Sequence, residues 1–419
     1  MHIPSKIDYE EILATPAMVR LTTAMDGGTR TPTILLRCTA LQAKYALQAS
    51  SYKVVFLPIS NAWLAYGLEI KDDPENPMLL WSIIERESEF QALKCLSKSP
   101  NCALAIFTET GANVAFVQAE CVFKDLSIEE LIPHIKLHPD DDREGPEEAV
   151  KAFDAIRASK ETNLTSWIEG EVSPTENWKL IGSTFITGTL SSPLIDFSDN
   201  DEGGQQELLV EVLADGVSPV EAHRSPQVAI SQKKSRELID VIATSDHTYF
   251  LFESKSLTIF ADEKLPTRDK LAKNTAKHLK KAVGQLRGAI RHLRDGKSIS
   301  SMQGGTIKIP NSPGHAIVVI SDISLLHDSD EHGADLLLEF LKETEHMLHI
   351  VDPTELTRII QASNRAVMEG DLVNAVDAFD VFFQRRFENA IKHDIAAIKI
   401  VHQFPSDENR MGKGYVPVE

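Results

Sequence analysis

The sequence predicts an α/β protein (α+β mixed) in which a β-rich N-terminal domain precedes a mixed sheet flanked by helices. Three observations predict this fold class. Short β-branched and aromatic runs dominate the first part of the chain, a long amphipathic helix begins at residue 268, and near-continuous apolar runs alternate with helical segments after residue 313. The chain has 419 residues, which is long enough for roughly two or three domains with their own cores.

The expected domain boundaries follow shifts in composition. Residues 1–135 form the β-rich N-terminal domain, for which we expect a role in sensing, regulation or assembly. Residues 136–204 form a helical connector and a linker rich in Ser, Asp, Asn and Gly. Residues 205–419 form the second domain, which is expected to end in two helices, over 372–386 and 388–401.

Short strands are expected throughout the first domain. Asp26, Gly27, Gly28 and Thr29 are typical of a hairpin turn, because they lack the Lys-Ser/Thr ending of a phosphate-binding loop. A helix is expected around 85–96. The expected strands are 33–41, 52–58, 63–70, 103–107 and 114–123.

Composition indicates a globular, non-membrane protein. The formal net charge is −19 and 42% of the residues are hydrophobic, which argues against indiscriminate coating of nucleic acid. No apolar run reaches the roughly 18 residues of a membrane span, and the N-terminus lacks the plan of a signal peptide. We therefore expect a cytoplasmic protein with no membrane partner. The four cysteines show no metal-ligand spacing, so buried thiols are expected.

A β-hairpin is expected within residues 237–257. Its strands, 239–244 and 249–257, are β-branched and aromatic, and a turn-forming segment separates them. With a two-residue loop, the commonest hairpin connection, opposed residues have numbers that add up to 493. Asp240 then faces Glu253, and Lys255 projects from the same face of the sheet.

Two carboxylates in such apolar strands require a cation. A buried strand seldom carries a carboxylate unless it is paired or binds a metal ion. One interpretation is a structural ion pair with Lys255, and the other is a metal site. By contrast, Glu69 and Lys71 end an apolar run beside a polar turn, which is typical of a solvated strand end.

Asp240, followed after twelve residues by Glu253, Ser254 and Lys255, resembles the PD-(D/E)xK (restriction-endonuclease-like) nuclease superfamily. Ile239 stands where that motif has its proline. The resemblance implies that Asp240, Glu253 and the backbone carbonyl of Ser254 hold Mg²⁺, with Mn²⁺ as a substitute. It also implies that Lys255 orients and acidifies the attacking water. Carboxylate oxygens suit Mg²⁺, and phosphodiester hydrolysis needs positive charge at the scissile phosphate.

The amphipathic helix over 268–294 carries nine Lys/Arg and one Asp beside its apolar stripe. Such a surplus of one sign in an acidic chain is what a phosphate backbone would select, although a solvated helix face is the common alternative. The resemblance also implies a glutamine on this helix, which Gln285 matches. The residues expected to bind nucleic acid are Lys273, Lys277, Lys280, Lys281, Arg287 and Arg291.

Other segments complete the expected second domain. A helix over 205–214 precedes the hairpin and offers Glu207 or Glu211 as a further metal ligand, of which we favour Glu207. The apolar run 314–322 is typical of a strand buried on both faces. A helix (335–345), a strand (347–351) and a helix beginning near Asp352 follow.

Together these features predict a Mg²⁺-dependent nuclease that hydrolyses DNA phosphodiester bonds. An endonuclease acting in antiviral defence against phage or foreign DNA, regulated by its N-terminal domain, would suit the resemblance and the architecture. RNA remains open as a substrate. A homo-oligomer is expected, as is a protein or ligand partner for the N-terminal domain. The alternatives are a non-catalytic nucleic-acid-binding or scaffold protein that retains a degenerate nuclease fold, and a different metal-dependent enzyme acting on nucleotides.

Overall fold

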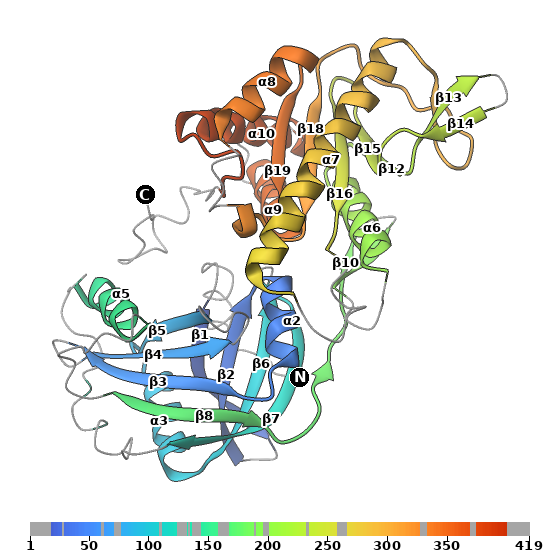
Figure 1. Cartoon of the computed structure of the whole chain (residues 1–419). Coiled ribbons are helices and arrows are strands. Elements are labelled where there is room, and N and C mark those ends of the chain that lie inside the picture. Colours follow the sequence, from blue (N-terminus) through green and yellow to red (C-terminus); the bar gives the residue numbers. More distant parts are fainter. Residues whose placement is uncertain are drawn as a thin grey trace. The chain divides into compact units, whose positions relative to one another are not determined.

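The structure is a computed structural model, and its described residues fall into two compact units, one up to Ile181 and one from Gly182 onward. Figure 1 shows the elements of both units. Among the described residues, no helix is long and apolar enough to cross a bilayer. The structure describes residues 18–26, 29–59, 63–70, 77–108, 111–123, 132, 135, 144–157, 167–187, 190–195, 201–231, 234–257, 266–326, 333–368 and 374–399.

The first unit is built on a nine-stranded sheet in the order β1-β2-β6-β7-β8-β3-β4-β5, with β9 beside β7. The β2–β6 pair is parallel and the other pairs are antiparallel. The accompanying helices are α2 (Ala40–Gln48), α3 (Glu87–Lys98) and α5 (Glu144–Arg157). The strands are β1 (Met18–Asp26), β2 (Thr29–Cys38), β3 (Tyr52–Ile59), β4 (Trp63–Ile70), β5 (Met78–Ile83), β6 (Asn101–Thr108), β7 (Asn113–Phe123), β8 (Ile168–Pro174) and β9 (Lys179–Leu180).

This sheet curls into a nearly closed barrel, because side chains join its two edge strands, β1 and β5. Arg20 Nη1 on β1 donates to Ser82 Oγ on β5 (2.5 Å) and forms an ion pair with Glu89 on α3 (3.1 Å). Tyr66 donates its hydroxyl hydrogen to the same Glu89 oxygen (2.8 Å). The Leu21 backbone N–H donates in turn to the Tyr66 hydroxyl (3.0 Å). The buried carboxylate of Glu89 therefore holds the two edge strands of the sheet close together.

The expected strands of the first unit are found, together with elements that the sequence analysis omitted. β1 and β2 form the predicted hairpin, pairing as far as Asp26 opposite Thr29. β5 and α2 were not expected, and β1 was implied only by the predicted hairpin turn. β8 lies within the expected connector, residues 136–204, but pairs with both β7 and β3, so part of that segment contributes a strand to the first sheet.

The second unit is built on a five-stranded mixed sheet in the order β12-β15-β16-β18-β19. β15 lies antiparallel to both of its neighbours, β12 and β16, whereas β18 and β19 continue the sheet parallel to β16. The strands are β12 (Glu221–Arg224), β15 (Val241–Thr244), β16 (Tyr249–Lys255), β18 (His315–Ile320) and β19 (Met347–Val351). The helices are α6 (Glu202–Asp215), α7 (Arg268–Arg294), η3 (Ile323–Leu326), α8 (Ala334–Thr344), α9 (Pro353–Met368) and α10 (Ala375–Lys392).

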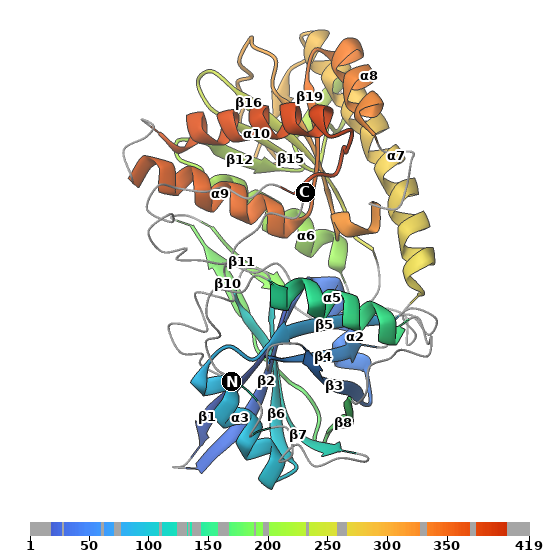
Figure 2. The same cartoon turned by 90° about the vertical axis from the view of Figure 1, so that its left-hand side faces the viewer.

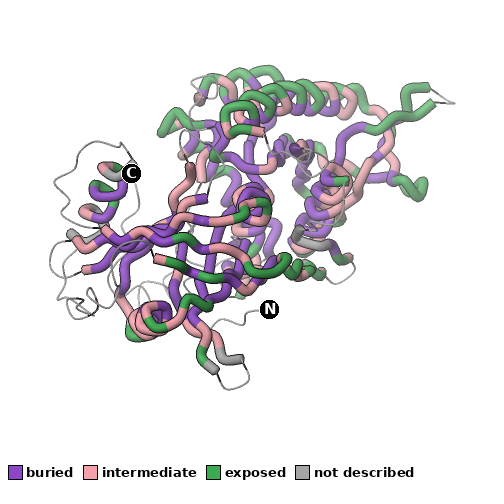
Figure 3. The backbone as a smooth tube through the Cα atoms, turned by 60° about the horizontal axis from the view of Figure 1, so that its bottom comes forward, coloured by how far each residue is buried: buried purple, intermediate pink, exposed green. Residues whose placement is uncertain are grey.

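Helices cover both faces of this sheet. Ala316 and Val318 on β18 belong to the apolar core under α7 and α8. Ile317 and Val319, which alternate with them, belong to the core under α6, α9 and α10. Figure 2 shows α9 and α10 side by side on one face, and Figure 3 shows the central strands buried. The predicted two-sided burial of this strand is therefore confirmed.

Two smaller sheets accompany the second unit. In one, β13 (Gln227–Ser231) pairs with β14 (Lys234–Glu237) and with β17 (Ile299–Ser300). β13 and β14 extend as an arm beyond the main sheet (Figure 1). In the other, β10 (Ser183–Ile186) pairs with β11 (Ser191–Ile195).

The predicted mixed α/β class is confirmed, and α7 has the expected bounds. Thr267 caps it by accepting from the Lys270 N–H, and Gly296 adopts a positive φ of 66° just beyond its end. The helix expected over 388–401 is wrong. α10 instead continues to Lys392, and the chain then turns, with Asp394 in the left-handed region at φ 55°. The expected tail over 405–419 lies outside the described residues.

Candidate functional site

The hairpin of β15 and β16 brings the predicted site residues together. Val241 lies opposite Phe252 and Thr244 opposite Tyr249, which confirms the register expected from the two-residue loop. Asp240 directly precedes β15, and its Oδ2 accepts a hydrogen bond from the Ser254 backbone N–H at 2.7 Å. The carboxylate of Asp240 is thereby held against the strand that carries Glu253 and Lys255.

Lys255 contacts three oxygens at once. Its Nζ donates to Glu253 Oε1 and to the Ser254 carbonyl oxygen (3.0 Å), and it lies 3.7 Å from Asp240 Oδ2. These are the three groups that the sequence analysis assigned to a metal ion. In this structure the lysine ammonium therefore supplies the positive charge that faces them.

The carboxylates outnumber the cation in this buried cluster. Glu253 is fully buried, and its Oε2 has no hydrogen-bond partner in the described part of the chain. Burial, and then the negative charge of Asp240, raises the pKa of Glu253 to about 7. Burial also raises the pKa of Asp240 against the opposing effect of Lys255. A further cation would stabilise both ionised acids.

Glu207 on α6 belongs to the same electrostatic environment. Burial and the negative charges of Asp240 and Glu237 raise its pKa to about 7, although Lys255 opposes the shift. α6 is fixed against the sheet, because the Gln206 side-chain amide donates to the Val319 carbonyl oxygen at 2.9 Å. Glu207 is therefore electrostatically close to Asp240 and Lys255, and its role as a metal ligand stays a prediction.

Glu211, one turn further along α6, is engaged elsewhere. Its Oε1 accepts from the Arg224 backbone N–H (3.0 Å), and its Oε2 lies 3.6 Å from Arg224 Nε. This pair joins α6 to β12, the edge strand that the sequence analysis missed. Glu211 is therefore a less suitable metal ligand than Glu207.

Two α7 residues lie electrostatically close to the cluster, and one of them was not predicted. Lys281 favours ionisation of Asp240. Burial and the charges of Lys255, Lys281 and Lys277 lower the pKa of His278, whose Nδ1 has no hydrogen-bond partner among the described residues. The sequence did contain a signal, since positions 278, 281 and 285 share one helix face.

Gln285 lies on this face as an exposed side chain. No described hydrogen bond joins Gln285 to the carboxylates of the cluster. Its predicted role therefore stays a prediction.

The basic residues of α7 differ in whether an acid already pairs with them. Arg287 pairs with Glu343 of α8 at 2.6 Å. Lys273 pairs along the helix with Asp269 at 3.3 Å, where both side chains are exposed. The remaining predicted nucleic-acid-binding residues are exposed and form no ion pair within the described residues: Lys277, Lys280, Lys281 and Arg291.

Basic side chains continue from α7 onto the β13–β14 arm. Arg236 Nη2 lies 2.6 Å from His292 Nε2, and Lys297 Nζ lies 2.9 Å from His292 Nδ1. A neutral imidazole has only one acceptor nitrogen, so it cannot accept from both cations. Burial and these two neighbours lower the pKa of His292. An anion placed here would relieve the excess of donors.

The donor set of the hairpin cluster suits a hard cation such as Mg²⁺. Among the described residues, no three His, Cys, Asp or Glu side chains form a ready-made metal cluster. Mg²⁺ is usually held by one or two carboxylates and keeps several waters, so two acids and a carbonyl suffice. The unpartnered Oε2 of buried Glu253 is consistent with such a ligand.

Comparison with known proteins gives no further guide to this site. The chain matches no family model, no curated protein and no solved structure. The roles of Asp240, Glu253 and Lys255 therefore rest on their spacing in the sequence and on the geometry of the cluster.

Proposed function

We propose that this protein is a metal-dependent nuclease that hydrolyses DNA phosphodiester bonds at the β15–β16 hairpin. The observation that carries the proposal is the fully buried Glu253, which has one unpartnered oxygen beside a second carboxylate and a lysine. A cluster built only for stability would satisfy that oxygen, because a buried unpaired acceptor is costly. The mixed sheet flanked by helices is also the arrangement that the resemblance to PD-(D/E)xK nucleases implies.

Asp240, Glu253 and the Ser254 carbonyl would hold Mg²⁺ or Mn²⁺, with Glu207 as a further ligand. The ion would supply positive charge to the scissile phosphate and lower the pKa of the attacking water. Lys255 would then turn from the carboxylates toward the substrate, where its ammonium can orient the water and face the phosphate. On α7, Lys281 acts electrostatically on Asp240, and Lys255 acts electrostatically on His278.

α7 and the β13–β14 arm would bind the DNA backbone. Their free cations, above all Lys277, Lys280, Lys281 and Arg291, concentrate positive charge in a chain whose net charge is −19. Concentrating basic residues in one place favours a polyanion there without coating the whole surface. Gln285, on the same helix face as Lys281, would position the backbone near the cluster.

The first unit would regulate the nuclease. It has its own nearly closed sheet, and the cluster residues all come from the second unit. A sensing unit joined to a nuclease suits an endonuclease that acts in the cytoplasm against phage or foreign DNA. A homo-oligomer and a protein or ligand partner for the first unit belong to the same proposal.

The test is cleavage of plasmid and linear DNA, with RNA alongside, in Mg²⁺, Mn²⁺ or EDTA. Wild type is expected to cleave DNA only with a metal ion. Lys255→Ala and Glu253→Gln are expected to lower the rate by about 10²–10³-fold, as losing a group that stabilises transition-state charge does. Lys392→Ala, an exposed lysine at the end of α10, is the matched control. Unchanged cleavage by Glu253→Gln would overturn the proposal.

Metal binding has a readout that does not require activity. Mg²⁺ at a hundred times its Kd is expected to stabilise the second unit by about 2.7 kcal/mol and to leave the first unit unchanged. Glu253→Gln should lose this effect, which calorimetry can follow.

A second candidate is a non-catalytic DNA-binding protein. It is favoured by the contacts of the Lys255 ammonium with all three oxygens. DNA binding without metal binding or cleavage would select it.

A further inference from the structure

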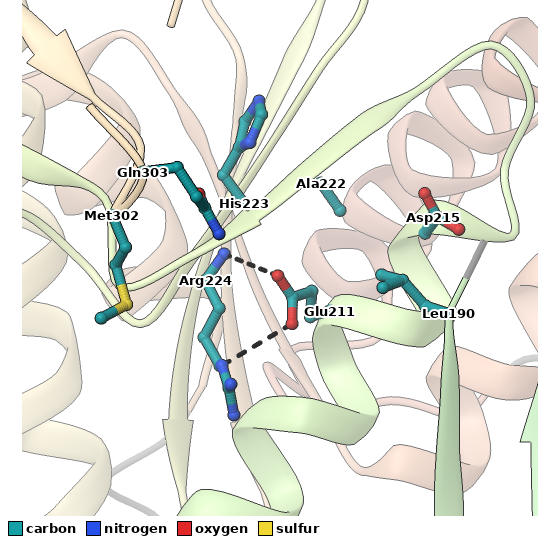
Figure 4. A pocket seen from close by; sticks show the side chains of 8 residues that line it. All are labelled: Leu190, Glu211, Asp215, Ala222, His223, Arg224, Met302 and Gln303. Carbon is teal, nitrogen blue, oxygen red and sulfur yellow. Dashed lines mark hydrogen bonds and ion pairs between the residues drawn. The ribbon is translucent and has the colours of Figure 1, made fainter. Parts of the chain in front are cut away.

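A polar cavity of about 270 Å³ opens beside the candidate site in the second unit. Figure 4 shows Met302 and Gln303 on one side, Leu190 and Asp215 on the other, and the Glu211–Arg224 pair between them. Met302 and Gln303 belong to the exposed turn that follows β17, and 67% of the Met302 surface is accessible. The cavity is therefore lined mainly by polar and charged side chains, and Leu190, Ala222 and Met302 are its apolar residues.

The elements that line this cavity, α6 and β12, also carry or adjoin groups of the hairpin cluster. Arg224 pairs with Val241 across the β12–β15 ladder, so it lies beside Asp240, whose carbonyl accepts from the Ser225 N–H at 2.7 Å. Arg224 also acts electrostatically on Glu207. Glu207 and Glu211 are one helical turn apart, about 6 Å along α6. A chain bound at the cluster can therefore continue into the cavity.

Arg224 retains donors for a ligand. Its Nε and its backbone N–H face Glu211. Its two terminal nitrogens bond no group in the described part of the chain, and the side chain is 39% exposed. A guanidinium presents its donors in a planar fork that matches phosphate. One anionic group can therefore bind here while the Glu211 pair keeps the side chain in place.

We propose that this cavity binds the nucleotide next to the scissile phosphate, a deepening that rests on the proposed nuclease function. Arg224 contacts the phosphate of that nucleotide. Its base packs against Met302, on the side of the cavity where Gln303 lies, and presents its polar edge to Gln303. Amide and carboxylate side chains are common partners of base edges.

The substrate class follows from this arrangement. A base can enter the cavity only when it is unstacked and unpaired, and taking a base out of a duplex costs a few kcal/mol. Single-stranded DNA, frayed ends and mismatched positions avoid most of that cost. The enzyme therefore prefers single-stranded or locally unpaired DNA to an intact duplex.

The test compares a labelled single-stranded oligonucleotide with the same sequence in a closed hairpin. Anisotropy in Ca²⁺ measures binding, and incubation in Mg²⁺ measures cleavage. Gln303→Ala, in an exposed turn, is expected to weaken single-strand binding about fivefold through the lost hydrogen bonds, without affecting the hairpin. Arg224→Lys is expected to weaken it about tenfold, because the fork is lost and the charge kept. Gln361→Ala, exposed on α9, is the matched control.

An oligonucleotide of abasic sites removes the bases without altering the protein. It is expected to bind to wild type at least as weakly as the intact strand binds to Gln303→Ala, because both the hydrogen bonds and the packing of the base are lost. Equal binding of intact and abasic strands, or of single strand and hairpin, would overturn the cavity proposal while leaving the nuclease proposal intact. Base-dependent binding without cleavage by wild type would support the cavity and overturn the nuclease.

Discussion

Glu89 in the first unit and Glu253 in the second are both buried beside a basic side chain, at 2% and 0% exposure. Every oxygen of Glu89 is bonded. Its Oε1 accepts from Arg20 and from the Tyr66 hydroxyl, and its Oε2 accepts from two backbone N–H groups at the start of α3, at 3.0 and 3.2 Å. Within the described part of the chain, the Glu253 carboxylate accepts a hydrogen bond from Lys255 alone, through one of its oxygens, and shares that lysine with Asp240.

The difference teaches that burial alone does not separate a structural acid from a functional one. Glu89 closes a sheet and has a complete set of donors. Glu253 lies in a cluster where two carboxylates share one lysine and Glu253 Oε2 has no donor among the described residues, which is the arrangement that a ligand or metal ion completes. Charge balance and hydrogen-bond satisfaction are therefore the informative quantities.

The largest effect is expected at the structural acid. Glu89→Ala should lower the unfolding free energy of the first unit by about 3–5 kcal/mol, because Arg20 and its other donors lose their partner. Tryptophan fluorescence isolates this unit, since all four tryptophans precede residue 182. Glu87→Ala, exposed on the same helix, should change it by less than about 0.5 kcal/mol. If Glu89→Ala lowered the unfolding free energy as little as Glu87→Ala does, the contrast between Glu89 and Glu253 would not hold.

Substitution of Glu253 is expected to raise the unfolding free energy, whereas substitution of Glu89 lowers it. Its pKa rises from 4.5 to about 7 in the folded state, so the protonated form stabilises the fold below pH 4.5 and that stability is lost as the pH passes 7. Glu253→Gln in EDTA should therefore raise the stability of the second unit by about 2 kcal/mol at pH 8 and flatten its pH dependence.

Urea unfolding followed by circular dichroism measures the difference in unfolding free energy between wild type and Glu253→Gln. The buried histidines His346 and His349, whose pKa values are lowered, contribute equally to both and cancel. A destabilised Glu253→Gln would mark this residue as a structural acid like Glu89.

The smallest expected effect is on DNA affinity, and it separates the basic residues of α7 that pair with an acid from those that do not. Lys281→Ala should reduce DNA affinity several-fold and the salt slope by about 0.9, because a free phosphate contact is lost. Arg287→Ala should change both less, since Glu343 already neutralises that side chain. Anisotropy over a series of salt concentrations distinguishes them. Equal salt slopes for Lys281→Ala and Arg287→Ala would show that an existing ion pair does not keep a basic residue from binding DNA.

The sequence predicted the second unit best where local signals agreed. The hairpin register followed from turn chemistry and β-branched runs, and α7 followed from the Thr267 cap and its apolar stripe. β12 and β14 were missed because they are short and polar. Glu221–Arg224 is mostly half-buried and Lys234–Glu237 is exposed, and neither shows apolar alternation. β8 was placed in the connector because its partners, β3 and β7, are distant in sequence.

The candidate site was predictable only along its own hairpin. Spacing within one hairpin brought Asp240, Glu253 and Lys255 together, because neighbouring strands fix their faces. The choice between Glu207 and Glu211 required Arg224 on an edge strand that carries no sequence signal. The charge balance of the cluster could not be predicted, because it depends on side-chain contacts and residue spacing in the sequence does not determine them.

The position of Lys255 has a consequence for how the protein matures. Its ammonium acts as an internal counter-ion for the oxygens around it. Many small zinc domains unfold when a chelator removes their metal, because binding provides the folding free energy. Under the proposed function, assembly of the fold and loading with metal would be separate events. Chelation should then give a folded but inactive protein that regains activity when Mg²⁺ returns, so the supply of the ion would determine when the protein acts.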